Sequence, residues 1–330
     1  MLCYSALSCW DRPSGDEVLT RMDNRRSDQL TLFAFGAIVL IGGTNFVAVR
    51  FSLRELPPFW GATLRFAVAA LLLFAVALTQ KFPLPRGRAL IGAAIYGGLG
   101  FGAGYAFAMW GMQHVSAGLA AVIFASAPLL TFLLALLHGQ EKFRWRALVG
   151  GIVALIGIAV IFRGSVGTGV PLLSLLALVV AALCVAESAI IVKNFPKTHP
   201  VSTNAVAMAA GVILLVILSL LSRESWSVPV RASTWIALGY LIVLGSSAGF
   251  VLFLFVLKHW SASAASYQFV LFPVVAIILG AILERAPMSP SLIFGGGLVL
   301  ASVYAGAISQ PPPAEARPKL GSEPCMTCPE

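Results

Sequence analysis

Charged residues are scarce in this chain of 330 residues: 11% are Asp, Glu, Lys or Arg, whereas 59% are hydrophobic. A soluble domain carries about 25% charged residues, so this composition cannot cover a water-exposed surface. The same deficit excludes a disordered chain and a nucleic-acid-binding protein, despite the net charge of +9. Together with a mean hydropathy of +0.92, it predicts a polytopic membrane protein.

Residues with catalytic or metal-binding chemistry are also missing from the apolar runs. No Asp lies in any of them, and the four His residues stand at their ends or in loops. An intramembrane enzyme needs paired aspartates, a Ser-His pair or a metal cluster, so we predict no catalytic, metal or cofactor site. One C-x-x-C pair, Cys325 and Cys328, stands in a Pro-rich tail and cannot close a four-ligand zinc site alone.

Long apolar runs are abundant instead. A helix that crosses the hydrocarbon core needs about 20 mostly apolar residues. Ten runs meet this requirement: 30–49, 58–80, 89–111, 115–138, 146–162, 171–193, 203–222, 234–257, 262–283 and 289–308. We therefore predict an all-α fold of ten transmembrane helices. The flanking segments 1–29 and 309–330 are expected to be disordered cytoplasmic tails.

The distribution of Lys and Arg predicts the orientation of these helices. With ten spans and a cytoplasmic N-terminus, the inner segments hold fifteen Lys and Arg residues and the outer segments hold six. Cytoplasmic segments of membrane proteins carry an excess of basic residues. Both termini are therefore expected in the cytoplasm, and the protein in the cell membrane.

The second half of the chain repeats the first. HVSAGLAAVIFASAPLL at 114–130 aligns with HWSASAASYQFVLFPVV at 259–275, and Arg50 aligns with Lys193 at an offset of 143 residues. Spans one to five thus repeat as spans six to ten. Because five is odd, the second copy crosses the membrane in the opposite sense, which is typical of carriers that work by alternating access.

Two segments also carry a family resemblance. GGTNFVAVRFSLRELPPFWGATLRFAVAALLLF at 42–74 and APLLTFLLALLHGQEKFRWRALVGGIVALIGIAVI at 127–161 resemble the opening and the close of an EamA domain of the drug/metabolite transporter superfamily. The resemblance implies two EamA repeats, 30–162 and 171–308, in a carrier that exports small metabolites such as amino acids. The second repeat departs from the first: Met208 stands where Arg65 would recur, and Glu187 where Thr44 would.

Arg65 and Glu187 are the only charges well inside the predicted spans. A charge there costs at least about 2.5 kcal/mol on insertion scales, so a functional role is the default interpretation. Arg65 either binds a substrate carboxylate or holds neighbouring carbonyl groups. Glu187 is either a proton-coupling residue, since burial raises a carboxyl pKa, or a permanently neutral side chain.

Polar and aromatic residues complete the set of substrate-binding candidates. Asn45 lies near the outer end of span one, and Tyr96 lies deep in span three, where Tyr105 could also line an aromatic pocket. Tyr267 and Gln268 break the repeat symmetry in span nine, where the first copy has two apolar residues. These side chains either bind substrate or connect helices.

Two prolines, Pro128 and Pro273, fall in mid-span at equivalent positions of the two repeats. Each removes a backbone hydrogen bond, so each is expected to kink its helix. Such kinks expose carbonyl groups where a cavity is lined.

The function predicted from these observations is secondary transport, with a small-molecule substrate, the lipid bilayer and protons as the partners. The alternatives are a transport-inactive membrane scaffold and, less favoured, an intramembrane enzyme. A monomer and a homodimer are both compatible with the sequence, as are several substrates and coupling ions.

Overall fold

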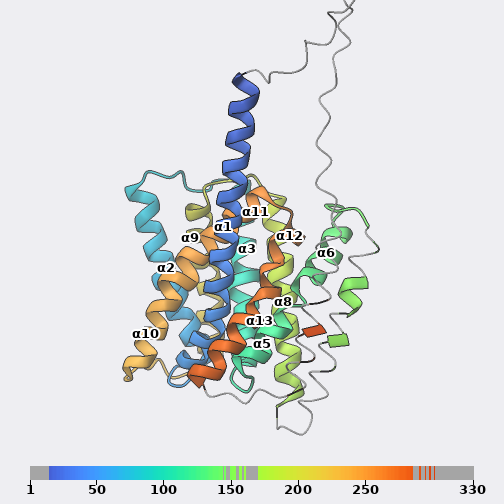
Figure 1. Cartoon of the computed structure of the whole chain (residues 1–330). Helices are drawn as coiled ribbons and strands as arrows, with labels where there is room; N and C mark the ends of the chain where they lie inside the picture. Colours follow the sequence, from blue (N-terminus) through green and yellow to red (C-terminus); the bar gives the residue numbers. More distant parts are fainter. Residues whose placement is uncertain are drawn as a thin grey trace, which may run out of the picture.

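A computed structural model describes residues 15–143 and 170–284, together with isolated residues between 145 and 160 and between 290 and 301. Within these residues every regular element is a helix, and the long helices run side by side in one bundle (Figure 1). In the first half of the chain they are α1 (Gly15–Ser52), α2 (Pro58–Thr79), α3 (Arg88–Gly97), the π-helix η1 (Gly98–Gly104), α4 (Tyr105–Gly111), α5 (Ala117–Phe124) and α6 (Ala127–Leu137). In the second half they are α8 (Leu172–Lys193), α9 (Pro200–Leu221), α10 (Ala232–Tyr240), η2 (Leu241–Ala248), α11 (Gly249–His259), α12 (Ala262–Ser266), α13 (Gln268–Leu279) and η3 (Gly280–Glu284).

Eight of the predicted spans are confirmed in the described residues. Eight helical stretches are long and apolar enough to cross a membrane: Gln29–Ser52, Pro58–Thr79, Arg88–Gly111, Ala117–Leu137, Leu172–Lys193, Pro200–Leu221, Ala232–His259 and Ala262–Leu283. They correspond to spans one to four and six to nine. The predicted fifth and tenth spans lie largely outside the described residues, as do Cys325 and Cys328.

The expected N-terminal tail is shorter than predicted. Helix α1 begins at Gly15, so residues 15–29 are helical rather than disordered. The segment DEVLTRMDNRRSDQL contains neither Gly nor Pro, and its acidic residues at the start favour a helix N-terminus. The disorder predicted for residues 15–29 rested on their polar composition, which is also compatible with an exposed helix.

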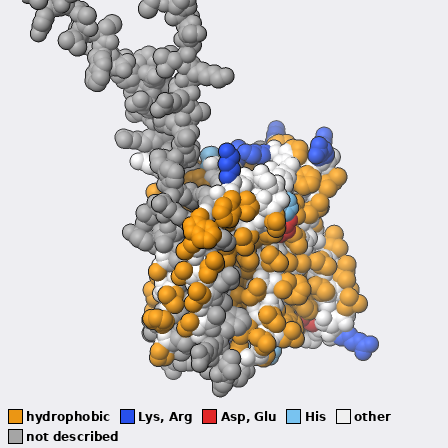
Figure 2. Space-filling view, turned by 90° about the vertical axis from the view of Figure 1, so that its right-hand side faces the viewer, with side chains coloured by type: hydrophobic (Ala, Val, Ile, Leu, Met, Phe, Trp, Pro, Cys, Tyr) orange, Lys and Arg blue, Asp and Glu red, His pale blue; other side chains and the backbone are white. Residues whose placement is uncertain are grey.

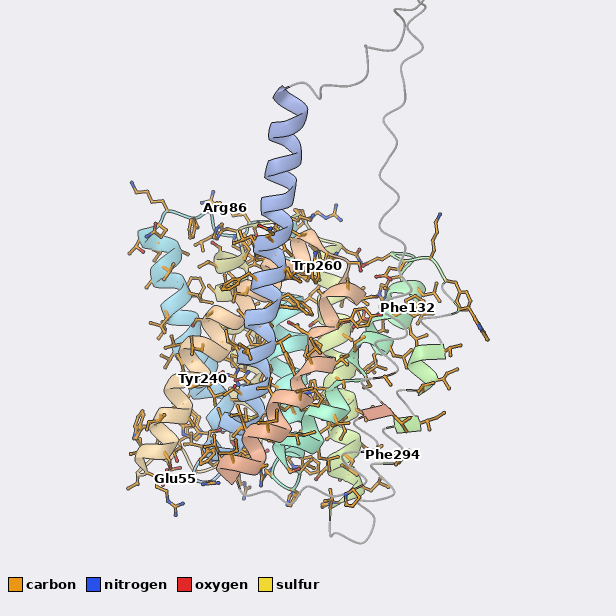
Figure 3. The ribbon with its side chains drawn as sticks, viewed as in Figure 1. Glu55, Arg86, Phe132, Tyr240, Trp260 and Phe294 are labelled. Atoms are coloured by element: carbon orange, nitrogen blue, oxygen red, sulfur yellow. The ribbon has the colours of Figure 1, made fainter. Side chains whose placement is uncertain are left out.

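The loops gather at two opposite ends of the bundle (Figure 3). Arg86 and Trp260 lie at one end, and Glu55 lies at the other. At the second end, Glu55 accepts hydrogen bonds from the Arg231 backbone N–H at 3.1 and 3.2 Å. We call these the Arg86 end and the Glu55 end. The loops predicted to be cytoplasmic include the one that carries Arg86, and the loops predicted to be outside include those that carry Glu55 and Arg231.

The two halves of the chain share local structure at the predicted repeat offset. The π-helices η1 and η2 begin 143 residues apart, at Gly98 and Leu241. The side chains of Ser116 and Ser261 cap α5 and α12 by accepting the N–H groups of Leu119 and Ala264. The aligned residues Arg50 and Lys193 also make equivalent contacts. Arg50 donates hydrogen bonds to the carbonyl groups of Met112 and Gln113, which follow span three. Lys193 donates one to the carbonyl group of Trp260, which follows span eight.

Both proline-containing spans are interrupted. Span four breaks at Ala125 and Ser126, so Pro128 stands in the first turn of α6, where its missing N–H is tolerated. Span nine breaks at Tyr267, between α12 and α13, and Pro273 lies inside α13. The breaks therefore fall before the prolines and divide each span into two helices.

Candidate functional site

A cavity of about 110 Å³ lies inside the bundle, between helices of the two halves of the chain. A cavity of this volume has room for several water molecules, since one needs about 10–15 Å³. Most of the lining is apolar or aromatic. Its polar side chains are those of Asn45, Arg65, Tyr96, Tyr105, Ser188 and Gln268.

Arg65 is fully buried, on α2. Its Nε donates a hydrogen bond of 2.7 Å to the Ser246 hydroxyl, on η2 in the other half of the chain. The guanidinium carbon lies 4.9 Å from the ring centre of Phe66 and 5.0 Å from that of Tyr105. Neither Nη1 nor Nη2 forms a hydrogen bond of standard geometry with a described residue, although the Tyr105 side chain lies close enough to interact with the guanidinium. Two buried donor groups of Arg65, which lines the cavity, therefore keep hydrogen-bonding capacity.

Asn45, on α1, lies beside Arg65. A Cβ atom added to Gly245 would lie 2.4 Å from Asn45 Oδ1 and 3.3 Å from Arg65 Nη2, so both side chains pack on this glycine. Oδ1 of Asn45 is buried and accepts no hydrogen bond from a described residue. The Asn45 acceptor and the Arg65 guanidinium, which is a donor, therefore both lie next to Gly245.

Gln268 supplies a second unpaired acceptor. It is the first residue of α13, directly after the break at Tyr267, and 3% of it is exposed. Its Oε1 has no hydrogen-bond partner in the described part of the chain. Tyr267 is half-buried and does not line the cavity. The structure thus separates two neighbours that the sequence analysis grouped together.

Aromatic rings form one wall of the cavity. Phe101 contacts Tyr96 at 5.4 Å and Phe250 at 4.6 Å between ring centres, both edge to face. Tyr105 lies edge to face with Phe66 at 4.6 Å. Such pairs stabilise each other beyond their area burial, so the wall has a defined shape.

Glu187 does not line the cavity. Its Oε1 lies 3.2 Å from His138 Nε2, at the end of α6, and its Oε2 is buried without a hydrogen-bond partner among the described residues. The two side chains are 23% and 36% exposed. The next residue on α8, Ser188, does line the cavity. Glu187 is therefore adjacent to the site through the helix, without reaching into it.

Sequence reasoning missed the residues of the second half that complete the Arg65 environment: Gly245, Ser246 and Phe250. One signal was available. Ser246 and Ser247 are consecutive hydroxyl residues in the middle of the apolar run 234–257. A polar pair in mid-span points to a partner on a neighbouring helix.

A membrane-spanning helical bundle with an internal cavity, whose polar groups have free hydrogen-bonding capacity, has the architecture of a membrane carrier. The comparisons with known proteins agree. The chain belongs to the EamA-like transporter family, whose model matches residues 30–163 and 172–305. It is therefore a multi-pass membrane transporter of the cell membrane, and not an enzyme.

Relatives with curated names lead to the same conclusion. The chain is 30% identical over 256 residues to the "Uncharacterized inner membrane transporter YedA" of Escherichia coli, covering 76% of this chain and 82% of the relative. It is 30% identical over 243 residues to the "Probable terminal-alkyne amino-acid exporter" of Streptantibioticus cattleyicolor, covering 72% and 80%. A solved crystal structure superposes with a TM-score of 0.67 at 18% identity, over 85% of this chain and 97% of the other, which supports the fold.

Proposed function

We propose that the protein is a secondary transporter that exports small metabolites such as amino acids by alternating access. The observation that carries this proposal is the buried guanidinium of Arg65, which lines the cavity and has no carboxylate partner among the described residues. A buried cation without a counter-ion is costly, so the guanidinium is expected to bind an anionic group of the substrate. A carboxylate accepts both Nη donors in parallel, which is the strongest common pairing of a guanidinium.

The other cavity groups favour an amino acid over a simple acid. Asn45 Oδ1 and Gln268 Oε1 are unpaired acceptors, which suit the N–H donors of an ammonium group. The wall of Phe101, Tyr105 and Phe250 suits an apolar side chain. The name of the Streptantibioticus relative, an amino-acid exporter, supports the same substrate class.

Alternating access requires two arrangements of the halves around the cavity. We propose ten spans in two inverted repeats, with both termini in the cytoplasm. The equivalent π-helices, serine caps and carbonyl contacts of Arg50 and Lys193 in the two halves support the repeat, and the bias of basic residues supports the orientation. Cysteine accessibility tests it: positions 82 and 142 should react from the inside, and positions 55 and 226 from the outside. If 142 and 226 report the same side, the inverted repeat is wrong.

The two halves of the chain contact each other at the Glu55 end. Glu224 accepts hydrogen bonds from the N–H groups of Phe59 and Trp60, in the first turn of α2, at 3.1 and 2.7 Å. The Trp60 ring stacks on Trp226 with 4.6 Å between ring centres. We propose that these contacts break when the cavity opens to this end.

Proton coupling is assigned to Glu187 in this proposal. An ionised carboxylate is costly in the bilayer, so Glu187 is expected to exchange a proton as its surroundings change. His138, at 3.2 Å, would share the charge, and Ser188 on the same helix would link this change to the cavity. Inflow of the proton would then drive export of the substrate.

Transport by purified protein in proteoliposomes tests the function. A panel of amino acids and other small metabolites is assayed with and without an imposed pH gradient. The wild type should move at least one amino acid and accumulate it when the gradient is imposed. Glu187→Gln should retain exchange of that substrate but lose accumulation. Accumulation by Glu187→Gln would exclude Glu187 as the coupling residue, and the absence of any transport would favour the scaffold interpretation.

A further inference from the structure

A second pocket, separate from the central cavity, lies at the Arg86 end of the bundle. It has a volume of about 60 Å³ and is formed by the first turns of α3, the end of α8, the loop 194–199, the start of α9 and the end of α11. One of these helices, α3, belongs to the first EamA repeat and the others belong to the second. The pocket therefore bridges the two repeats at one end of the membrane-spanning region.

Three lysines converge on this pocket from three different elements. Lys193 comes from α8, Lys197 from the loop and Lys258 from the last turn of α11. No described residue that lines the pocket is acidic. Lys193 Nζ donates a hydrogen bond of 2.5 Å to the Trp260 carbonyl, whereas Lys197 and Lys258 are exposed and form no ion pair with a described residue. The charge of Glu141 acts on Lys193 from outside the pocket, and Lys197 and Lys258 keep the pocket itself positively charged.

The charge of Lys258 also acts on its surroundings. Burial lowers the pKa of His199, and the nearby charge of Lys258 lowers it further. Helix α9 begins at Pro200, which lines the pocket, and the positive end of its dipole points the same way. The lysine charges and the start of α9 therefore both favour a negatively charged occupant.

The pocket has a fixed shape. Phe195 packs directly on Gly92 of α3, where an added Cβ would lie 2.4 Å from the Phe195 ring. The hydroxyl groups of Thr198 and Thr203 are hydrogen-bonded to each other at 2.6 Å. Val192, Leu254 and Leu257 form an apolar wall below the lysines. The lysines and hydroxyl groups suit a small anionic group, and the apolar residues suit an apolar chain attached to it.

We propose that this pocket binds the phosphate group of an anionic phospholipid from the leaflet at the Arg86 end. The pocket lies where membrane-spanning helices end, which is the depth of the lipid headgroups. Its volume of about 60 Å³ is large enough for one phosphate group but not for a whole lipid. On the face seen in Figure 2, Lys and Arg side chains gather at the upper end above a hydrophobic belt. A bound lipid would hold α3 against α8 and α11, and so join the two repeats.

Binding is measured on the full-length protein purified in a neutral detergent. Thermal stability and native mass spectrometry are recorded with phosphatidylglycerol, with phosphatidylcholine and with inorganic phosphate. The double variant Lys197→Gln/Lys258→Gln removes two exposed charges from the pocket. Its matched control, Lys81→Gln/Arg86→Gln, removes two basic residues of the predicted inner loop 81–88 that do not line the pocket.

Phosphatidylglycerol should bind and stabilise the wild type and the control, and phosphatidylcholine should bind weakly. The pocket variant should bind phosphatidylglycerol about thirtyfold more weakly, because each lysine beside an anionic headgroup contributes a factor of about five. If both double variants lost the same amount of phosphatidylglycerol affinity, the cause would be the general surface charge and not this pocket, which would overturn the proposal. Equal stabilisation by inorganic phosphate alone would also overturn it, since the occupant would then be a free anion.

Discussion

The Nε atom of Arg65 donates a 2.7 Å hydrogen bond to the hydroxyl group of Ser246, and this bond joins the two EamA repeats at the wall of the cavity. It holds the guanidinium of Arg65, whose two Nη atoms are buried, at the cavity that this side chain lines. The first repeat thus supplies the buried charge, and the second supplies the hydroxyl group that orients it.

Loss of the Ser246 hydroxyl should weaken substrate binding. Ser246→Ala leaves Arg65 Nε without a partner, a loss of about 1–3 kcal/mol for a buried polar group. The KM for a transported amino acid should rise at least about fivefold, measured by efflux from proteoliposomes. Ser247→Ala is the matched control, because Ser247 donates to the Ile242 carbonyl of its own helix. Equal effects of the two variants would mean that the Arg65 bond has no special role.

A methyl group at Gly245 should obstruct the site. The added Cβ would lie 2.4 Å from Asn45 Oδ1, which is closer than real Cβ contacts allow. Gly245→Ala is therefore expected to reduce transport strongly. Gly239→Ala, on the same span, places its Cβ in open space and should leave transport unchanged. Efflux normalised to the amount of folded protein compares them, and wild-type efflux by Gly245→Ala would remove Asn45 from the site.

Gln268 and Tyr267 should behave differently, although they are neighbours. Gln268 lines the cavity with an unpaired acceptor, so Gln268→Ala should raise the KM. Tyr267 does not line the cavity, so Tyr267→Ala should affect transport less. Val122→Ala and Ile123→Ala, at the equivalent positions, remove fully buried apolar groups and should mainly reduce stability. An unchanged KM in Gln268→Ala would exclude a binding role.

Contacts at the Glu55 end should weaken in acid. The Thr234 side chain, followed by the backbone N–H and the charge of Arg231, holds the pKa of Glu55 below its usual range. A carboxyl whose pKa is lowered in the folded state stabilises it above the unfolded pKa, and this contribution is lost as the pH falls through the folded pKa. Labelling of a cysteine at position 226 should therefore rise at low pH. Glu55→Gln should show the raised labelling already at neutral pH and no further rise.

Hydrophobic run lengths predicted the eight described spans, because about 20 apolar residues have few alternatives to a crossing helix. The rarity of buried charge likewise singled out Arg65. The position of Glu187 could not be predicted, because a helix face is set by packing: its side chain meets His138 outside the cavity, while Ser188 faces inward. The roles of Ser246 and Gly245 could not be predicted either, because they depend on packing between the repeats. Ser246 contacts Arg65 and Gly245 lies next to Asn45 only in the folded bundle.

The carboxylate-binding role of Arg65 is the central claim, and substrate counterflow in proteoliposomes tests it most directly. Each transported amino acid is compared with its carboxamide, which lacks the negative charge, in the wild type and in Arg65→Gln. The wild type should strongly prefer the amino acid. Arg65→Gln should lose that preference while remaining folded in the membrane. An Arg65→Gln protein that transports amino acids with the KM and selectivity of the wild type would contradict the account.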